Sequence, residues 1–123
     1  MRIIGLGVDL AEIERVRRLL ERYPRFSERC FTVHERGYAF SHARPERRLA
    51  ARFAGKEAVS KVLGTGFVGM AWSDIEILSD GRGKPTVSLF GRASRRAKDI
   101  GIQHIEISLS HSQEYAIAFA VGY

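Results

Sequence analysis

The spacing of apolar residues changes along the chain, and these spacings predict its helices and strands. Apolar residues three to four positions apart, as on one helix face, recur in four segments, most weakly in 33–41. The predicted helices cover residues 10–23, 33–41, 45–63 and 91–100. Other segments are short apolar runs or alternate apolar with polar residues, as strands do. The predicted strands cover residues 3–8, 72–79, 86–90, 103–110 and 115–121.

Proline and glycine mark where these elements end. Pro24 ends the first helix, Pro45 suits the first turn of the third, and Gly101 closes the fourth. Residues 80–85 contain Asp-Gly, a strong turn signal, so the strands on either side form a hairpin. Hairpins with segregated helices indicate an α+β fold, a small antiparallel sheet with helices packed on it. The length suits one domain, residues 1–123.

Basic residues outnumber acidic ones, with 20 Lys and Arg against 14 Asp and Glu and a net charge of +6. The excess comes from arginine in residues 15–29, 44–52 and 92–96. Such a surface attracts an anionic partner: a nucleic acid, a phosphorylated cofactor, an acidic protein or a membrane surface. Arginine binds phosphate and carboxylate well because its planar fork donates two parallel hydrogen bonds. Charge alone does not choose between these partners.

The composition disfavours several classes of protein. The chain has no run of about 18 apolar residues, so no membrane span is expected. Its first residues lack the long apolar segment of a signal peptide. Cys30 is the only cysteine, which leaves no internal disulfide and no cysteine-rich metal site. A cytoplasmic protein is therefore expected.

Glu57 falls within the apolar stripe of the predicted helix 45–63, where a charge is costly. Leu49 and Phe53 belong to the same stripe, and Lys61 follows Glu57 by one turn. A carboxylate in such a place needs a partner, a proton or a metal ion. Glu57 and Lys61 are therefore either an i,i+4 ion pair or part of a functional site.

Asp9 lies where the first predicted strand meets the first predicted helix. The segment from Asp9 to Glu12 has the spacing of a capping box, with Asp in place of the usual Ser or Thr. One interpretation of Asp9 is therefore a helix cap. The other is a ligand for a hard metal ion, because Mg²⁺ typically takes one or two carboxylates together with substrate phosphates. The two roles are compatible.

Three further segments carry residues suited to anions, and each has a simpler interpretation. Residues 64–66, Gly-Thr-Gly, can bring backbone N–H groups to an anion or merely end a helix. Arg82 and Lys84 can contact phosphate, although a hairpin turn explains their segment equally well. Ser110 and His111 are neighbours in the sequence, but a nucleophile and its base are recognised by geometry rather than adjacency.

Five segments in order along nearly the whole chain carry motifs. They are Gly-Leu-Gly-Val-Asp at 5–9, Arg-Phe-Ala-Gly-Lys-Glu-Ala at 52–58, Ser-Lys at 60–61 before Gly-Thr-Gly at 64–66, Gly-Lys-Pro at 83–85 and Ser-Leu-Ser-His at 108–111. In combination they resemble the holo-acyl-carrier-protein synthases, the small phosphopantetheinyl transferases of fatty-acid synthesis. Gly55 stands where this family often has alanine or a larger residue, which predicts a cost in helix stability of up to about 1 kcal/mol.

The resemblance implies a fold, an assembly and a reaction. The fold is that of the 4′-phosphopantetheinyl transferases, and the assembly is a homotrimer with active sites at the subunit interfaces. The reaction transfers 4′-phosphopantetheine from coenzyme A to a serine of an acidic acyl carrier protein and releases adenosine 3′,5′-bisphosphate.

The resemblance also implies roles for individual residues. Asp9 and Glu57 would bind Mg²⁺, and Lys61 would stabilise or protonate the departing phosphate. Either Glu57 or a metal-bound water would take the serine proton. The candidate contacts to coenzyme A are Arg52, Ser60, Lys61, Gly64, Thr65, Lys84, Pro85 and His111.

Three arginines of the first predicted helix form a candidate docking surface. Arg15, Arg18 and Arg22 lie within a stripe about 60° wide at 100° per residue. A solvated basic face is the simpler interpretation. Glu14 and Glu21 lie off the stripe, however, and the implied activity needs a surface for an acidic protein. We therefore predict that the carrier protein docks on this helix.

Two other classes of protein remain open at this stage. A small nucleic-acid-binding domain would interleave aromatic residues with its basic ones, and the arginine-rich helices have few. A structural subunit would bury Glu57 and Lys61 merely as a pair. The resemblance favours the enzyme, with no nucleic-acid or membrane partner. Residues 23–46 carry no strong family signal and are left without a role.

Overall fold

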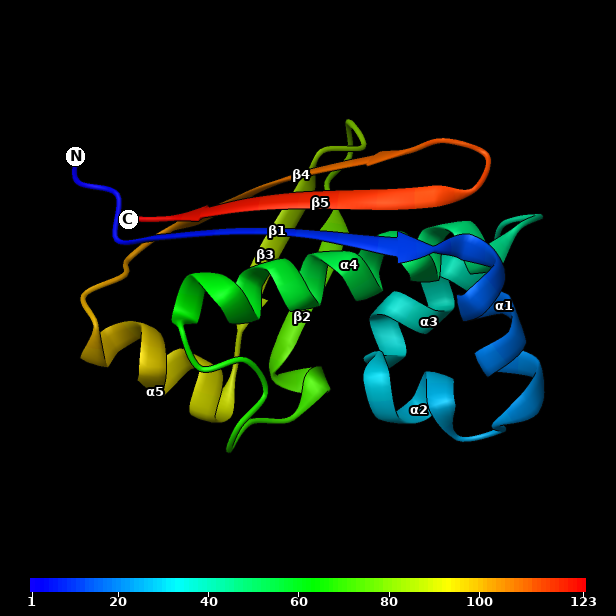
Figure 1. The fold of residues 1–123 in the computed structure, drawn as a ribbon, viewed down its shortest axis with the longest axis horizontal. Helices are drawn as coiled ribbons and strands as arrows, with labels where there is room; N and C mark the ends of the chain where they lie inside the picture. Colours follow the sequence, from blue (N-terminus) through cyan, green and yellow to red (C-terminus); the bar gives the residue numbers. More distant parts are fainter.

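The computed structural model describes all 123 residues and confirms the α+β class. Helix α4 lies beneath a three-stranded antiparallel sheet (Figure 1). The shorter helices lie on the side of α4 that faces away from this sheet. The strands are β1 (Gly5–Glu12), β2 (Ile75–Ser79), β3 (Pro85–Leu89), β4 (Ile105–His111) and β5 (Tyr115–Gly122). The helices are α1 (Ile13–Arg22), α2 (Phe26–Cys30), α3 (Val33–Phe40), α4 (Pro45–Leu63) and α5 (Gly91–Asp99), with a 3₁₀ turn, η1 (Trp72–Asp74).

The strands form two separate antiparallel units. The three-stranded sheet has the order β1-β5-β4, and β2 and β3 form the predicted hairpin. On β1 and β5 the inner face of the three-stranded sheet carries small residues, which allow α4 to approach closely. A Cβ added to Gly7 would lie only 1.9 Å from the Ala58 carbonyl oxygen, so this contact requires glycine.

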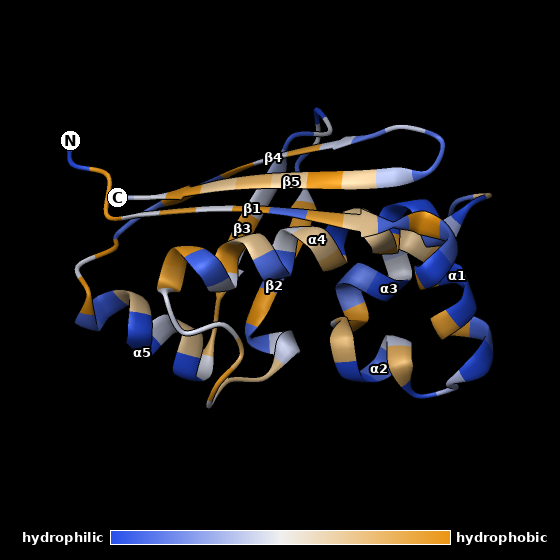
Figure 2. Cartoon of the chain, viewed as in Figure 1, coloured by the Kyte–Doolittle hydropathy of each residue, from blue (hydrophilic) through white to orange (hydrophobic).

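Larger apolar side chains project from the opposite face of this sheet, here called the outer sheet face. Leu6, Val8 and Leu10 of β1 are more than half exposed, and Ile117 and Phe119 of β5 are 44% and 45% exposed. Figure 2 shows this apolar character along β5 and part of β1. A contiguous exposed apolar face of this kind marks an interaction surface.

Helix α4 has the predicted bounds. It begins at Pro45 and is followed by Gly64, whose φ of 77° caps the helix in the left-handed region. Because α4 lies between the sheet and the other elements, it is buried around most of its circumference, and no single apolar stripe faces the core. The prediction that Glu57 lies in such a stripe is therefore wrong; its side chain is half-buried at the one open side.

The predicted junction at Asp9 is also wrong. Strand β1 continues to Glu12, and Asp9 pairs with Ala118 in the middle of the ladder. Helix α1 starts at Ile13, and its N-cap residue, Glu12, makes no side-chain capping bond. The alternation of inward and outward residues extends through residues 9–12 and outweighs the capping-box spacing. Asp9 is therefore a strand residue and not a helix cap.

Smaller differences occur elsewhere. Helix α2 was not predicted, and the predicted strand 72–79 begins with the turn η1. Gly55 has a packing role besides its helix propensity, since a Cβ there would lie 2.5 Å from Ile77 Cδ1. None of the helices has the length and hydropathy of a membrane span.

Candidate active site

Asp9, Glu57 and Lys61 meet where β1 crosses α4. The Lys61 ammonium donates hydrogen bonds to the Val8 carbonyl oxygen at 2.8 Å and to Asp9 Oδ1 at 3.2 Å. The absence of a side chain at Gly7 allows this crossing, because its Cα faces the Lys61 Cβ and the Ala58 carbonyl. The Glu57–Lys61 ion pair, one of the two alternatives from the sequence, is not formed; Lys61 turns to Asp9 instead.

Glu57 and Asp9 form a pair of neighbouring carboxylates. Burial raises the pKa of Glu57, and the negative charge of Asp9 beside it raises this pKa further, while Lys61 and Arg15 act in the opposite direction. A cation beside Asp9 and Glu57 would offset this repulsion between two neighbouring negative charges. Lys61 remains half exposed and Asp9 is 16% exposed, so solvent and substrate reach the group. This donor set fits a hard ion such as Mg²⁺, which keeps several water ligands.

A second group of predicted residues lines a cavity of about 200 Å³ between α4, the β2–β3 hairpin and the end of β4. Arg52, Pro85 and His111 contribute to it. Arg52 is 5% exposed and donates to Ser79 Oγ at 2.8 Å, and its burial lowers the pKa of its guanidinium. Three arginines and no carboxylate line this cavity, which gives it a strongly positive potential suited to phosphate.

Sequence reasoning missed Arg48 and Tyr38 in this cavity. Arg48 precedes Arg52 by one helical turn, a spacing that could have revealed it. The Arg48 Nε is buried without a hydrogen-bond partner. The Tyr38 ring lies under both guanidinium groups, 4.8 Å from Arg52 Cζ and 5.8 Å from Arg48 Cζ. Burial opposes ionisation of Tyr38, but Ser79 and the two arginines outweigh it and lower the pKa of the phenol.

Four other predicted residues lie outside these two groups. Ser60 is buried and donates to the Glu57 carbonyl oxygen at 2.7 Å, and Gly64 caps α4. Thr65 lines a basic cavity of about 280 Å³ together with arginines of α5. Lys84 is exposed on the hairpin turn next to the Arg52 cavity, with its ammonium 3.9 Å from Glu106. The structure therefore brings Arg52, Pro85 and His111 together with Lys84 at the edge of their cavity, and leaves Ser60, Gly64 and Thr65 apart from them.

The arginines of α1 are exposed, as predicted. Ile13 and Val16 turn to the core, which leaves Arg15, Arg18 and Arg22 in solvent. Arg17 pairs with Glu14 and Glu21, and so those two carboxylates do not neutralise the stripe. The ion pair of Arg18 with Glu12, at 3.7 Å, was not foreseen and offsets part of its charge.

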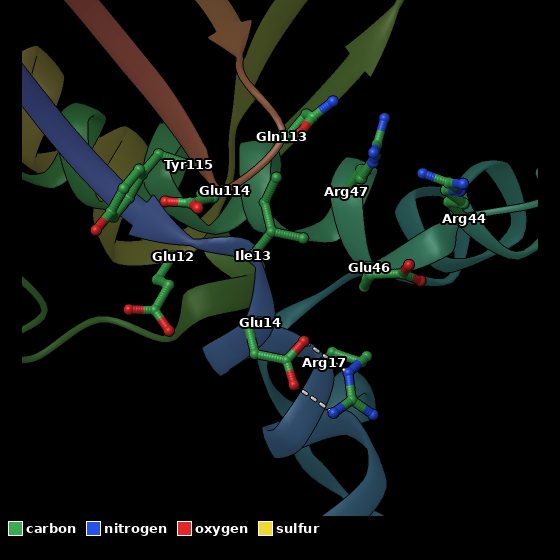
Figure 3. Close-up of a pocket in the computed structure, with 10 residues that line it drawn as sticks. All are labelled: Glu12, Ile13, Glu14, Arg17, Arg44, Glu46, Arg47, Gln113, Glu114 and Tyr115. Carbon is green, nitrogen blue, oxygen red and sulfur yellow. Dashed lines mark hydrogen bonds and ion pairs between the residues drawn. The ribbon is translucent and has the colours of Figure 1, made fainter.

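A larger cavity, of about 540 Å³, contains none of the candidate residues. It lies where β1 meets α1, beside the start of α4 and the β4–β5 loop (Figure 3). Its lining alternates acidic and basic side chains, with Glu12, Glu14, Glu46 and Glu114 against Arg17, Arg44 and Arg47. Because these charges largely balance, the cavity shows no preference for an anion or a cation.

Comparison with known proteins settles the family. Residues 5–120 match the model of the 4′-phosphopantetheinyl transferase superfamily. The chain belongs to this superfamily. It is 48% identical to the holo-[acyl-carrier-protein] synthase of Alkaliphilus metalliredigens over 121 residues, 98% of both chains. The resemblance found in the sequence is thereby confirmed, and so is the inference that the chain is an enzyme of the phosphopantetheinyl transferase family.

Solved structures of phosphopantetheinyl transferases confirm the predicted fold. The holo-[acyl-carrier-protein] synthase of Neisseria meningitidis has a TM-score of 0.91 with 31% identity, and the match covers 99% of both chains. A Bacillus anthracis holo-(acyl-carrier-protein) synthase in complex with CoA (3′,5′-ADP) has a TM-score of 0.81 with 35% identity, over 98% of this chain and 96% of that one.

Proposed function

We propose that the chain, as one domain, transfers 4′-phosphopantetheine from coenzyme A to a serine of an acidic acyl carrier protein, with adenosine 3′,5′-bisphosphate as the other product. The observation that carries this proposal is the meeting of Asp9, Glu57 and Lys61 at one exposed point. In the cytoplasm this reaction would supply carrier protein for fatty-acid synthesis. The bound CoA (3′,5′-ADP) of the Bacillus anthracis relative supports the choice of donor.

Asp9 and Glu57 are the residues that would hold Mg²⁺. When bound, it would neutralise charge on the pyrophosphate of coenzyme A. The two carboxylates supply the oxygen ligands that such an ion prefers, and the charge of Asp9 helps to raise the pKa of Glu57 when no cation is present. Asp9 is held in place by its strand, and Glu57 by the buried helix α4.

The remaining charged residues suit the rest of the reaction. The Lys61 ammonium lies within hydrogen-bond distance of Asp9 and is free to donate to a phosphate that leaves. Glu57, whose pKa is raised, is a base for the serine hydroxyl, and a water molecule beside it is the other candidate. The cavity with Arg48, Arg52 and His111 suits the phosphorylated nucleotide of coenzyme A.

Calorimetry with coenzyme A, with and without Mg²⁺, tests this function. We expect saturable binding that Mg²⁺ strengthens, and a mass increase of an apo-acyl carrier protein on its serine when all components are mixed. A nucleic-acid-binding domain would instead bind RNA or DNA saturably in a gel shift. A structural subunit would bind neither coenzyme A nor nucleic acid.

The outer sheet face supports self-association. Its five large side chains lie on two adjacent paired strands, with Val8 opposite Phe119 and Leu10 opposite Ile117. Left in water, this face would be a costly apolar patch on a chain of this size. A homotrimer built around three copies of this face would bury it, and would set the active sites next to neighbouring subunits.

Replacing Lys61 by alanine is expected to slow the chemical step. The loss should be about 100-fold in kcat, because the proposed partner of the ammonium is charge that develops in the transition state. Stability should change little, since the ammonium is half exposed and its ion pair with Asp9 is worth little. Steady-state kinetics of the purified variant provide the check. An unchanged kcat with a raised KM for the carrier protein would contradict this role.

Reversing Arg18 and Arg22 to glutamate is expected to weaken docking of the carrier protein. Exposed charges mainly steer the encounter, so KM for the carrier protein should rise about tenfold at low salt and converge with that of the wild type at high salt. Arg95→Glu/Lys98→Glu on α5 makes the same charge change on another exposed helix face and should have a smaller effect. Equal effects of the two double variants would show that net charge, and not α1, attracts the partner.

A further inference from the structure

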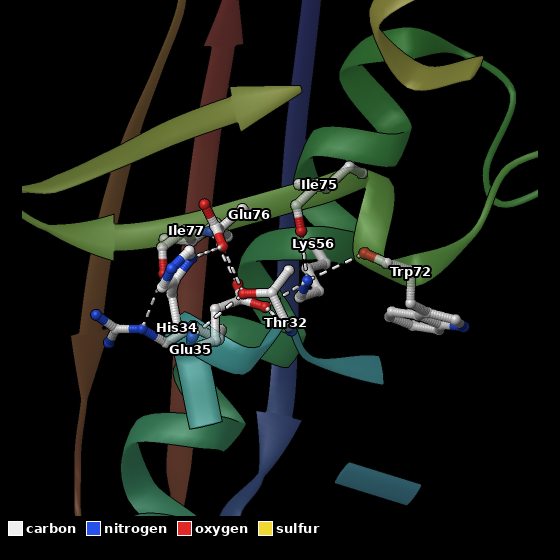
Figure 4. Close-up of polar contacts among 9 residues, drawn as sticks. Thr32, His34, Glu35, Lys56, Trp72, Ile75, Glu76 and Ile77 are labelled. Carbon is white, nitrogen blue, oxygen red and sulfur yellow. Dashed lines mark hydrogen bonds and ion pairs between the residues drawn. The ribbon is translucent and has the colours of Figure 1, made fainter. Parts of the chain in front are cut away.

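A fully buried ion pair lies one residue from Glu57. The Lys56 ammonium is 2.7 Å from Glu35 Oε1, and neither side chain is exposed to solvent. Lys56 also donates to the carbonyl oxygens of Trp72, at 3.0 Å, and Ile75 (Figure 4). The three protons of the ammonium therefore have three protein acceptors.

Glu35 is equally well satisfied. Its Oε1 accepts from the Thr32 backbone N–H at 2.9 Å as part of the capping box of α3, and its Oε2 accepts from the Ile77 N–H at 2.8 Å. The pair thus fastens α4 to α3, to η1 and to β2 at once. Residues 23–46, which had no role on sequence grounds, supply one half of this connection.

Stability alone gives little reason for such a pair. Removing two charges from water is costly, and apolar side chains of similar volume often serve a core equally well. What the pair adds is control over the rotation of α4 about its own axis. Hydrogen bonds from Lys56 to fixed backbone carbonyl oxygens are satisfied in only one such rotation. The packing of α4 against the sheet provides less of this, because small residues with shallow relief form much of both surfaces: Ala50, Ala54, Gly55 and Ala58 on the helix, and Ala116, Ala118 and Ala120 on β5. Val62 of α4 and Ile107 and Leu109 of β4 are the larger exceptions.

The long polar side chains of α4 point in two directions, some toward β2 and one toward β1. Arg52 and Lys56, one turn apart, reach toward β2, where they bond Ser79 and the Ile75 carbonyl oxygen. Lys61, one turn beyond Glu57, reaches toward β1. Because consecutive residues differ by about 100° around a helix, fixing Lys56 on β2 fixes the direction in which Glu57 faces Asp9.

We infer that Glu35 and Lys56 are positioning residues, which hold α4 in the rotation that sets Glu57 beside Asp9. This inference rests on the proposed metal-assisted transfer. The pair touches no substrate. Its effect reaches the reaction through the backbone of α4, as outer partners of metal ligands do elsewhere.

The test replaces the pair by neutral side chains of similar size, Glu35→Gln with Lys56→Met. Mn²⁺ bound at the two carboxylates is titrated by electron paramagnetic resonance, with and without coenzyme A, and thermal unfolding is followed separately. We expect a folded protein whose Mn²⁺ affinity and kcat both fall by about 10- to 100-fold. The KM for the carrier protein should stay near that of the wild type, because α1 is not fastened by the pair.

Leu49→Ala is the matched control, since Leu49 is fully buried on the same helix but makes no polar contact. It should lower the melting temperature and leave Mn²⁺ affinity unchanged. A folded double variant with wild-type Mn²⁺ affinity would overturn the inference, as would an equal loss in Leu49→Ala. Should the double variant not fold, Glu35→Gln alone is read by the same criteria, because it keeps the size and one acceptor oxygen.

Failure of the proposed function is separable from failure of this inference. The first appears in the wild-type protein as absent coenzyme A binding or absent transfer. The second appears only in Mn²⁺ binding without coenzyme A, as a double variant that binds like the wild type or that loses no more affinity than Leu49→Ala.

Discussion

Glu57→Gln should reduce phosphopantetheine transfer by about 100- to 1000-fold, because the amide keeps the shape of the side chain and removes a charge that the metal ion and the transferring phosphate depend on. The structure adds an expectation about stability. The pKa of Glu57 is raised in the folded protein, so its ionised form is disfavoured there relative to the unfolded chain. At neutral pH the neutral amide should therefore leave stability unchanged or slightly higher.

Asp9→Asn should show the same loss of transfer. The stability of this variant also tests whether Asp9 caps a helix. Asp9 lies within β1 and caps no helix, so its melting temperature should stay close to that of the wild type. Activity is measured over a range of Mg²⁺ concentrations and stability by thermal unfolding. Near-normal activity of either variant at low Mg²⁺ would show that this carboxylate is not a metal ligand.

The long central helix was predictable because its signals are local. Pro45 and Gly64 bound it in the sequence as they do in the structure, and the hairpin turn at 80–85 is equally local. Asp9 shows where such signals fail. Its capping-box spacing is local, but the register of β1 against β5 depends on residues more than 100 positions away, and that register decided the outcome.

The candidate site was predictable in its parts but not in its contacts. The motifs singled out Glu57, Lys61 and Arg52, yet nothing in their spacing revealed that Lys61 would bond Asp9 rather than Glu57. The partners Glu35 and Lys56 are separated by a helix boundary and a loop. Lys56 lies in the motif at 52–58 but was given no role, and Glu35 is an ordinary charged residue in the sequence. Only the tertiary fold shows that both are fully buried. Charged residues are seldom buried, so no single-sequence rule selects them.

Phe119→Glu should dissociate the assembly that we propose. Phe119 lies between Val8 of β1 and Ser108 of β4, at the centre of the outer sheet face. A carboxylate buried there without a partner should weaken each subunit contact by more than about 2 kcal/mol, roughly 30-fold in affinity. The isolated subunit should remain folded, because the side chain is 45% exposed in the single chain and the inner face is untouched.

Analytical ultracentrifugation measures this dissociation, and a transfer assay at the same protein concentrations measures its consequence. Val33→Glu is the control, since Val33 is 71% exposed on α3 and lies away from the sheet. It should leave both the assembly and the activity unchanged. In Phe119→Glu we expect the transfer rate to fall together with the oligomer, because the proposed active sites lie at subunit boundaries. A monomeric variant with full activity would show instead that Asp9, Glu57 and Lys61 of one chain suffice, and that the exposed apolar face serves assembly alone.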